Sequence, residues 1–281
     1  MIKESIMNDN NKEEIPKVLN YRYWSYQNDE ESCIEEECPC FYPPLCSKER
    51  ELEWQGCFNL AIFYIIIIQI ILFITTIALS DNNRNSMSPD VKTLLSFGAS
   101  NSDKIWSKNQ FWRLITPIAL HANLIHITMN TLGQLIFCLG LEKNWGSIKF
   151  VIIYVGSGII GCLITSSVSV MNCGVGASGA LFGILGAYIT FLLLKISSIP
   201  NEDRSFAYVV PFVAVLGLIG SELVESIDNI GHFAGLFGGS FISLVVLNDS
   251  LLPETGFKWK MLGVSGIVLI LIIGLIFGLK Q

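Results

Sequence analysis

The feature that most constrains the fold is a series of long apolar runs separated by polar stretches. Seven such runs cover residues 58–79, 114–141, 148–170, 177–194, 206–221, 230–247 and 261–279. A helix that rises ~1.5 Å per residue needs about 20 apolar residues to cross a hydrocarbon core ~30 Å thick. The runs therefore predict an all-α protein with seven membrane spans. Because the run 206–221 is interrupted by Pro211, Gly217 and Gly220, six spans is the alternative.

The second run is longer than a span requires, so we expect its start to lie in the membrane interface. The run 58–79 follows a polar N-terminal segment and is too long for a cleaved signal peptide, so it is interpreted as a signal anchor.

Charge divides the chain into an acidic N-terminal segment and a nearly neutral body. Residues 1–56 hold 13 of the 24 acidic and 6 of the 18 basic side chains, which gives −7 against +1 for residues 57–281. This composition predicts a disordered tail. The body has neither a strongly basic region nor a phosphate-binding glycine loop, so no nucleic-acid partner is predicted.

The tail and the residue that follows it contain five cysteines whose spacing does not match a paired zinc motif, namely Cys33, Cys38, Cys40, Cys46 and Cys57. Solvated thiols are the favoured interpretation, with zinc binding or acylation near the membrane edge as alternatives.

The distribution of basic residues in the loops predicts the orientation of the spans. With the N-terminus in the cytoplasm, the short inner loops carry Lys143, Lys149, Lys195, Arg204, Lys258 and Lys260. The short outer loops 171–176 and 222–229 carry no Lys or Arg. Positive residues favour the cytoplasmic side, so the N-terminus is expected there. The loop 80–113 carries five bases, but it is long and is expected to be structured.

Two histidines and one serine are predicted to lie at the same depth in the membrane. Spans two, four and six run from outside to inside. His126 precedes Lys143 by 17 residues, Ser178 precedes Lys195 by 17, and His232 precedes Asn248 by 16. Each should therefore sit about 25 Å above the inner edge, near the outer surface. Ionisable groups at such positions are expensive and usually functional.

Two stripes of small residues predict close contact between spans four and six. Gly231, Gly235 and Gly239 recur every four residues, and Gly179, Gly183 and Ala187 form a matching stripe. Small faces let membrane helices approach closely, although their commonest use is packing alone. Here close approach would bring Ser178 within hydrogen-bond reach of His232, which could act as its base.

A second serine has the same local motif but the wrong depth. Ser265 lies in Gly263-Val264-Ser265-Gly266, only five residues after Lys260, so it is expected about 8 Å above the inner edge. We interpret that motif as helix packing.

His126 and Asn130 are four residues apart and share a helix face. Both carry donors for a developing oxyanion, and the Ser178 amide at a helix N-terminus is a third. The acids Glu222, Glu225 and Asp228 are interpreted as loop charges, so a dyad is favoured over a triad.

These motifs resemble the rhomboid family of intramembrane serine proteases. The matching elements are Trp112-Arg113, His121-x4-His126-x3-Asn130, Glu142, Gly176-Ala177-Ser178-Gly179 and Gly231-His232-Phe233-Ala234-Gly235. The resemblance covers about residues 57–250, as a six-helix core. A further span within 251–281 is similar to the six-plus-one layout of eukaryotic secretory-pathway members.

The resemblance implies specific roles for these residues. Ser178 would be the nucleophile and His232 the general base, while His126, Asn130 and the Ser178 amide would form the oxyanion hole. The remaining positions would support the structure or gating, namely Trp112, Arg113, His121, Glu142, Gly176, Gly179, Phe182 and Gly235. Phe182 replaces a tyrosine common in the family and is expected to keep its stacking on His232.

The predicted function is cleavage of single-pass transmembrane proteins near the outer or luminal face of a secretory-pathway or plasma membrane. The partners are these substrates and the lipid bilayer; no metal or organic cofactor is implied, and the oligomeric state is open. One alternative is an inactive rhomboid-like protein that binds or escorts membrane clients. Another is a permease that uses the three histidines, although no acid lies in the middle of a span to assist them.

Overall fold

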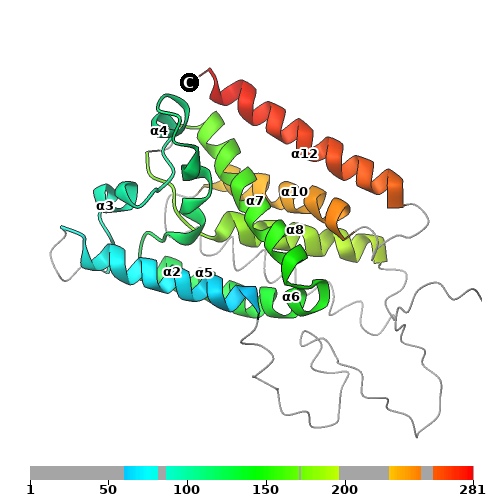
Figure 1. The fold of residues 1–281 in the computed structure, drawn as a ribbon, viewed down its shortest axis with the longest axis horizontal. Coiled ribbons are helices and arrows are strands. Elements are labelled where there is room, and N and C mark those ends of the chain that lie inside the picture. Colours follow the sequence, from blue (N-terminus) through cyan, green and yellow to red (C-terminus); the bar gives the residue numbers. More distant parts are fainter. Residues whose placement is uncertain (1–59, 82–86, 171, 196–227, 248–255, 281) are drawn as a thin grey trace, which may run out of the picture. The chain divides into compact units, whose positions relative to one another are not determined.

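The computed structural model describes residues 60–81, 87–170, 172–195, 228–247 and 256–280, and they are mostly helical (Figure 1). The long helical segments are α2 (Ala61–Ala78), α5 (Leu124–Gly133) continued by η4 (Gln134–Cys138) and α6 (Leu139–Trp145), α7 (Ser147–Val168), α8 (Ser178–Lys195), α10 (Asn229–Val246) and α12 (Gly256–Gly278). Apart from one bridge between Ser100 and Gly174, the described ranges contain no β-structure. The predicted all-α class is confirmed.

Five of these segments are long and apolar enough to cross a membrane. They are α2, the continuous helix Leu124–Trp145, α7, α10 and α12. α8 is a shorter apolar helix over Ser178–Leu194. The tail 1–56, its cysteines and the predicted span 206–221 lie outside the described residues, so the span count stays a prediction.

The second span begins later than its apolar run. Residues before it form the 3-10 helices η2 (Phe111–Leu114) and η3 (Thr116–Ala119), and α5 begins only at Leu124. Pro117 lacks an N–H group, and Asn123 caps α5 by accepting the His126 N–H at 2.8 Å. His121, which we expected within this span, therefore lies in the loop that precedes it.

α8 and α10 pack with almost no space between their backbones, as the stripes of small residues predict. A Cβ atom built on Gly235 would lie 2.2 Å from the carbonyl oxygen of Gly179, and one built on Gly239 would lie 2.0 Å from that of Gly183. Real Cβ atoms do not approach oxygen so closely, so the contact depends on glycine at both positions of α10. α7 packs against both helices, and Figure 1 shows α8 and α10 side by side in yellow-green and orange.

α12, red in Figure 1, packs on α10 and α7 through glycines. A Cβ on Gly263 would lie 2.6 Å from the Phe241 carbonyl oxygen, and Gly266 faces the Phe241 ring. Ser265, between them, is exposed and donates to the Leu262 carbonyl oxygen at 3.1 Å. The second serine motif is thus part of a helix contact.

Polar bonds inside the bundle connect α2 to η3 and the second span to α7. Gln69 of α2 is buried and donates to the Ile118 carbonyl oxygen at 3.1 Å. Gln134 of η4 donates to the hydroxyl of Tyr154 on α7 at 2.6 Å. The neighbouring Pro117 carbonyl accepts the Gly176 N–H at 2.9 Å, so α2 and η3 together hold the segment that leads into α8.

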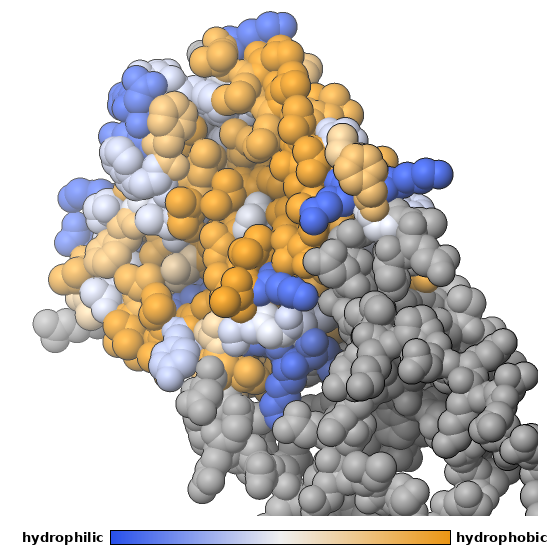
Figure 2. Space-filling view, turned by 45° about the vertical axis from the view of Figure 1, so that its right-hand side comes forward, coloured by the Kyte–Doolittle hydropathy of each residue, from blue (hydrophilic) through white to orange (hydrophobic). Residues whose placement is uncertain are grey.

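The outer surface of the bundle is largely apolar. Figure 2 shows broad orange areas on the face that it presents. On α2, the exposed side chains include Ile67, Ile71 and Ile74, and on α12 they include Leu269 and Ile272. An apolar surface of this extent suits contact with lipid chains, and the chain is a multi-pass membrane protein.

Candidate active site

Ser178 and His232 meet across the interface between α8 and α10. Ser178 is the first residue of α8, and His232 lies in the first turn of α10. The distance from Ser178 Oγ to His232 Nε2 is 2.6 Å, which is a short hydrogen bond. The Phe182 ring stacks on the imidazole, with centroids 4.6 Å apart and ring planes 12° from parallel. The structure thus brings a hydroxyl and a base together in the geometry that nucleophilic catalysis requires.

Gly176 brings His126 next to the segment that leads into Ser178. The Gly176 backbone has φ +133°, a conformation that residues with a side chain rarely adopt. A Cβ atom at this position would lie 2.8 Å from His126 Cε1 and Nε2, and 3.7 Å from Ser178 Oγ. Glycine is therefore required here both by the backbone conformation and by the imidazole.

Asn130 lies one turn after His126 and is buried. Its Nδ2 atom donates to the His126 backbone carbonyl oxygen at 3.0 Å, a bond within the helix that fixes the position of the amide. The amide has a second N–H, which remains for another acceptor. The structure thus places His126 and Asn130 on successive turns of α5, which packs against α8, the helix that begins at Ser178.

His121 supports the site from the loop before α5. It is fully buried, and its ring meets that of His126 edge to face with centroids 5.2 Å apart. Burial lowers the pKa of His121 to about 3, so its imidazole is neutral at neutral pH. It packs against His126 as a neutral ring.

Arg113 stabilises the loop that precedes α5, whereas Trp112 is exposed. The Arg113 side chain is buried and donates to the carbonyl oxygens of Leu95 and Ala99, both at 2.8 Å. Trp112 has 54% of its surface exposed. Arg113 thus joins η2 to α3 (Val91–Ser96) and to the segment between α3 and α4 (Ser102–Trp106), so residues 87–113 of this loop are structured, as predicted.

Glu142 lies near the end of the continuous helix Leu124–Trp145, whereas His126 lies near its start, and Glu142 is fully buried. Its carboxylate accepts the backbone N–H groups of Ala61 at 2.6 Å and Ile62 at 2.9 Å, and also a hydrogen bond from the Ser147 hydroxyl. Glu142 is therefore not a solvated surface charge. Glu142 caps α2 and joins it to α6 and α7.

Asp228 is the residue near the site that the sequence analysis missed. It was interpreted as a loop charge, but its carboxylate caps α10 by accepting the Gly231 N–H at 2.8 Å and the Thr165 hydroxyl at 2.7 Å. Burial raises the pKa of Asp228 above its ordinary value, while these two bonds act in the opposite direction. An aspartate two residues before an apolar helical run, here 230–247, is a capping signal that would have identified it.

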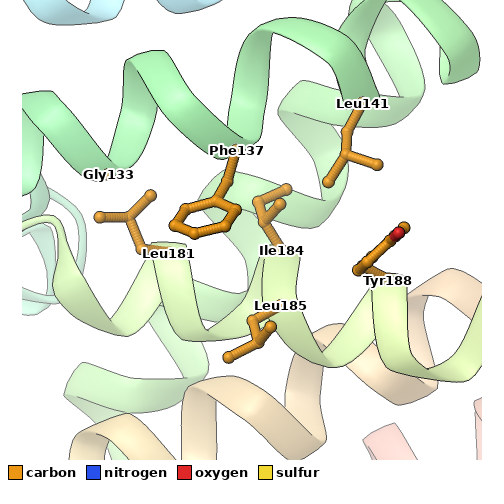
Figure 3. Close-up of a pocket in the computed structure, with 7 residues that line it drawn as sticks. All are labelled: Gly133, Phe137, Leu141, Leu181, Ile184, Leu185 and Tyr188. Atoms are coloured by element: carbon orange, nitrogen blue, oxygen red, sulfur yellow. The ribbon is translucent and has the colours of Figure 1, made fainter. Parts of the chain in front are cut away.

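Among the described residues, no three His, Cys, Asp or Glu side chains lie close enough together to hold a metal ion. The groove in Figure 3 lies between the second span and α8 and is lined by Gly133, Phe137, Leu141, Leu181, Ile184, Leu185 and Tyr188. None of these residues belongs to the Ser178–His232 pair, and no charged group lines the groove.

Fold and site together define a helical membrane protein with a serine–histidine pair near one end of its bundle. The rhomboid domain model matches residues 108–249, half of the chain, and this range includes every candidate site residue named above. The chain belongs to the rhomboid family.

Relatives come from bacteria, plants and parasites. The chain is 33% identical over 193 residues to rhomboid protease GluP of Bacillus subtilis, covering 69% of this chain and 36% of that protein. It is 31% identical over 175 residues to the RHOMBOID-like protein 6, mitochondrial, of Arabidopsis thaliana, covering 61% of this chain and 54% of that protein. It is 31% identical over 207 residues to rhomboid-like protease 1 of Toxoplasma gondii, covering 73% of this chain and 70% of that protein.

Proposed function

We propose that the chain is an intramembrane serine protease that cleaves single-pass transmembrane proteins. The observation that carries the proposal is the 2.6 Å contact between Ser178 Oγ and His232 Nε2, held by two helices whose backbones touch at glycines. Membership in a family that includes named proteases of bacteria and parasites supports it.

The proposed reaction begins with transfer of the Ser178 proton to His232 as the serine oxygen attacks the scissile carbonyl carbon. The oxyanion that forms accepts hydrogen bonds from His126, Asn130 and the Ser178 N–H. Because Ser178 is the first residue of α8, its N–H has no acceptor within the helix. His232 then returns the proton to the leaving amine, and water hydrolyses the acyl-enzyme with His232 again acting as base.

The substrate must present an extended peptide bond to this site, because the amides of an intact helix are hydrogen-bonded and shielded. We therefore propose substrates with small or helix-weakening residues near one end of their membrane span. A substrate would approach sideways from the lipid, past the predicted span 206–221.

We also propose the topology and domain division that the charges indicate. Residues 1–56 form a cytoplasmic tail, residues 57–250 the catalytic core, and residues 251–281 an added span of the six-plus-one type. The active site then faces the lumen or the outside of a secretory-pathway or plasma membrane.

The test is cleavage of a single-pass reporter with a helix-weakening outer segment by wild type, Ser178→Ala and Ser265→Ala in parallel. We expect wild type and Ser265→Ala to cut the reporter and Ser178→Ala to leave it intact. Retained cleavage by Ser178→Ala would overturn the site assignment. A folded wild type that neither cuts the reporter nor reacts with a fluorophosphonate would indicate an inactive, client-binding protein instead.

A further inference from the structure

His232 lies in the first turn of α10. Asp228 accepts hydrogen bonds from this turn with both its carboxylate and its backbone carbonyl oxygen. The carboxylate Oδ1 accepts the Gly231 N–H at 2.8 Å, and the backbone carbonyl accepts the His232 N–H at 3.1 Å. His232 and the residue before it are therefore both tied to one aspartate.

The same carboxylate also fixes this turn to a second helix. Thr165 of α7 is buried and donates its hydroxyl to Asp228 Oδ1 at 2.7 Å. One turn earlier on α7, a Cβ built on Gly161 would lie 2.8 Å from the Gly231 carbonyl oxygen. α7 thus contacts the start of α10 both through backbone packing and through the carboxylate.

The atoms around the Asp228 cap are closely packed. A Cβ on Gly231 would lie 2.3 Å from Asp228 Oδ2 and 2.7 Å from the Thr165 hydroxyl oxygen. The carboxylate therefore occupies one defined position, and the register of the first turn of α10 depends on it.

We propose that Asp228 is a positioning residue for His232, acting with Thr165 to set the imidazole at hydrogen-bond distance from Ser178. This inference rests on the proposed protease function. Asp228 acts through its acceptor oxygen, which bonds Gly231 and Thr165, and it takes no proton in the reaction. Losing these two bonds frees the first turn of α10, and a shift of about 1 Å in a catalytic group can reduce a rate about 100-fold.

The first measurement compares kcat and KM for reporter cleavage by wild type, Asp228→Ala, Asp228→Asn and Thr165→Val. Asparagine keeps the acceptor oxygen and is an equally good cap, but it removes the charge. We expect Asp228→Ala to lower kcat about 10- to 100-fold with KM nearly unchanged, Thr165→Val to give a smaller loss, and Asp228→Asn to restore most of the rate. Equal loss in Asp228→Asn and Asp228→Ala would overturn the proposal, since charge rather than position would then matter.

Asp90→Ala is the matched control. Asp90 caps α3 by accepting the Thr93 N–H at 2.7 Å and bonds the Ser80 hydroxyl at 2.6 Å, so its removal takes away the same kinds of bond from the outer loop. We expect its kcat to remain at the wild-type value. A loss equal to that of Asp228→Ala would show a general effect of loop destabilisation and refute the positioning role.

Amide hydrogen exchange over residues 229–233 provides a readout that does not need activity. We expect faster exchange in Asp228→Ala than in wild type, Asp228→Asn or Asp90→Ala. Unchanged exchange would overturn the inference even if the wild type is an active protease. A wild type without protease activity would refute the proposed function and with it this catalytic role of Asp228, whereas the exchange result would still report whether Asp228 holds the turn.

Discussion

Replacing Gly235 by alanine tests whether the close contact between α8 and α10 creates the Ser178–His232 pair. A Cβ at Gly235 would lie 2.2 Å from the Gly179 carbonyl oxygen and 3.0 Å from its carbonyl carbon. Carbon and oxygen approach no closer than about 3.3 Å even in weak C–H···O contacts, so the helices must separate by about 1 Å. Backbone atoms oppose the new methyl, and no side-chain rotation can relieve the clash.

The separation acts directly on the site. Gly179 follows Ser178, and Gly235 lies one turn after His232. Moving the helices apart by about 1 Å would stretch the 2.6 Å contact beyond hydrogen-bond range. We expect kcat to fall at least about 100-fold, and overpacking to cost about 1–3 kcal/mol of folding free energy.

The assay is reporter cleavage together with thermal unfolding in the same detergent. Gly156→Ala is the matched control, because a Cβ there meets only the Cδ1 atom of Ile242, at 2.9 Å, and that flexible side chain can move away. We expect the control to retain wild-type kcat. A Gly235→Ala variant with kcat within threefold of wild type would refute the reasoning.

Three further variants address the oxyanion hole, the cap of α2 and the packing of α12. Asn130→Ala should cost up to about 3 kcal/mol of transition-state stabilisation, measured as a fall in kcat/KM; an unchanged value would remove Asn130 from the oxyanion hole. Glu142→Ala leaves two N–H groups of α2 without their acceptor and should destabilise the fold by about 1–3 kcal/mol; an unaltered Tm would argue against the cap. Gly278→Leu should displace Trp106, since a Cβ there would lie 2.1 Å from the indole, and should speed hydrogen exchange over 102–106; unchanged exchange would contradict this packing.

Local sequence patterns predicted the helices and one long-range contact. The glycine stripes indicated the approach of α8 and α10, because small residues that recur every four positions lie on one face of a helix and let another helix come close. Counting residues from the inner loop charges put Ser178 and His232 at one depth and Ser265 elsewhere. The structure places Ser178 and His232 together, while their catalytic roles remain predictions.

Other features depend on contacts between distant residues, which a local pattern does not report. Glu142 caps a helix that begins about 80 residues earlier in the chain, so no local sequence motif around Glu142 or Ala61 indicates the contact. The excess length of the run 114–141 indicated that its start lies outside the span, but hydropathy did not reveal the 3-10 helix η3 or the point where α5 begins, because these residues are as apolar as a span. The local capping bond of Asp228 to Gly231 was signalled by the sequence, but its second partner, Thr165, lies on another helix and leaves no local pattern.

The measurement that tests the central claim most directly is labelling of the membrane-embedded protein with a fluorophosphonate, followed by mass spectrometry of the modified peptide. The proposed nucleophile predicts one labelled serine, Ser178, with labelling lost in His232→Ala and retained in Ser265→Ala. Labelling at another serine, or labelling of Ser178 that is unaffected by loss of His232, would contradict a catalytic pair at the α8–α10 contact.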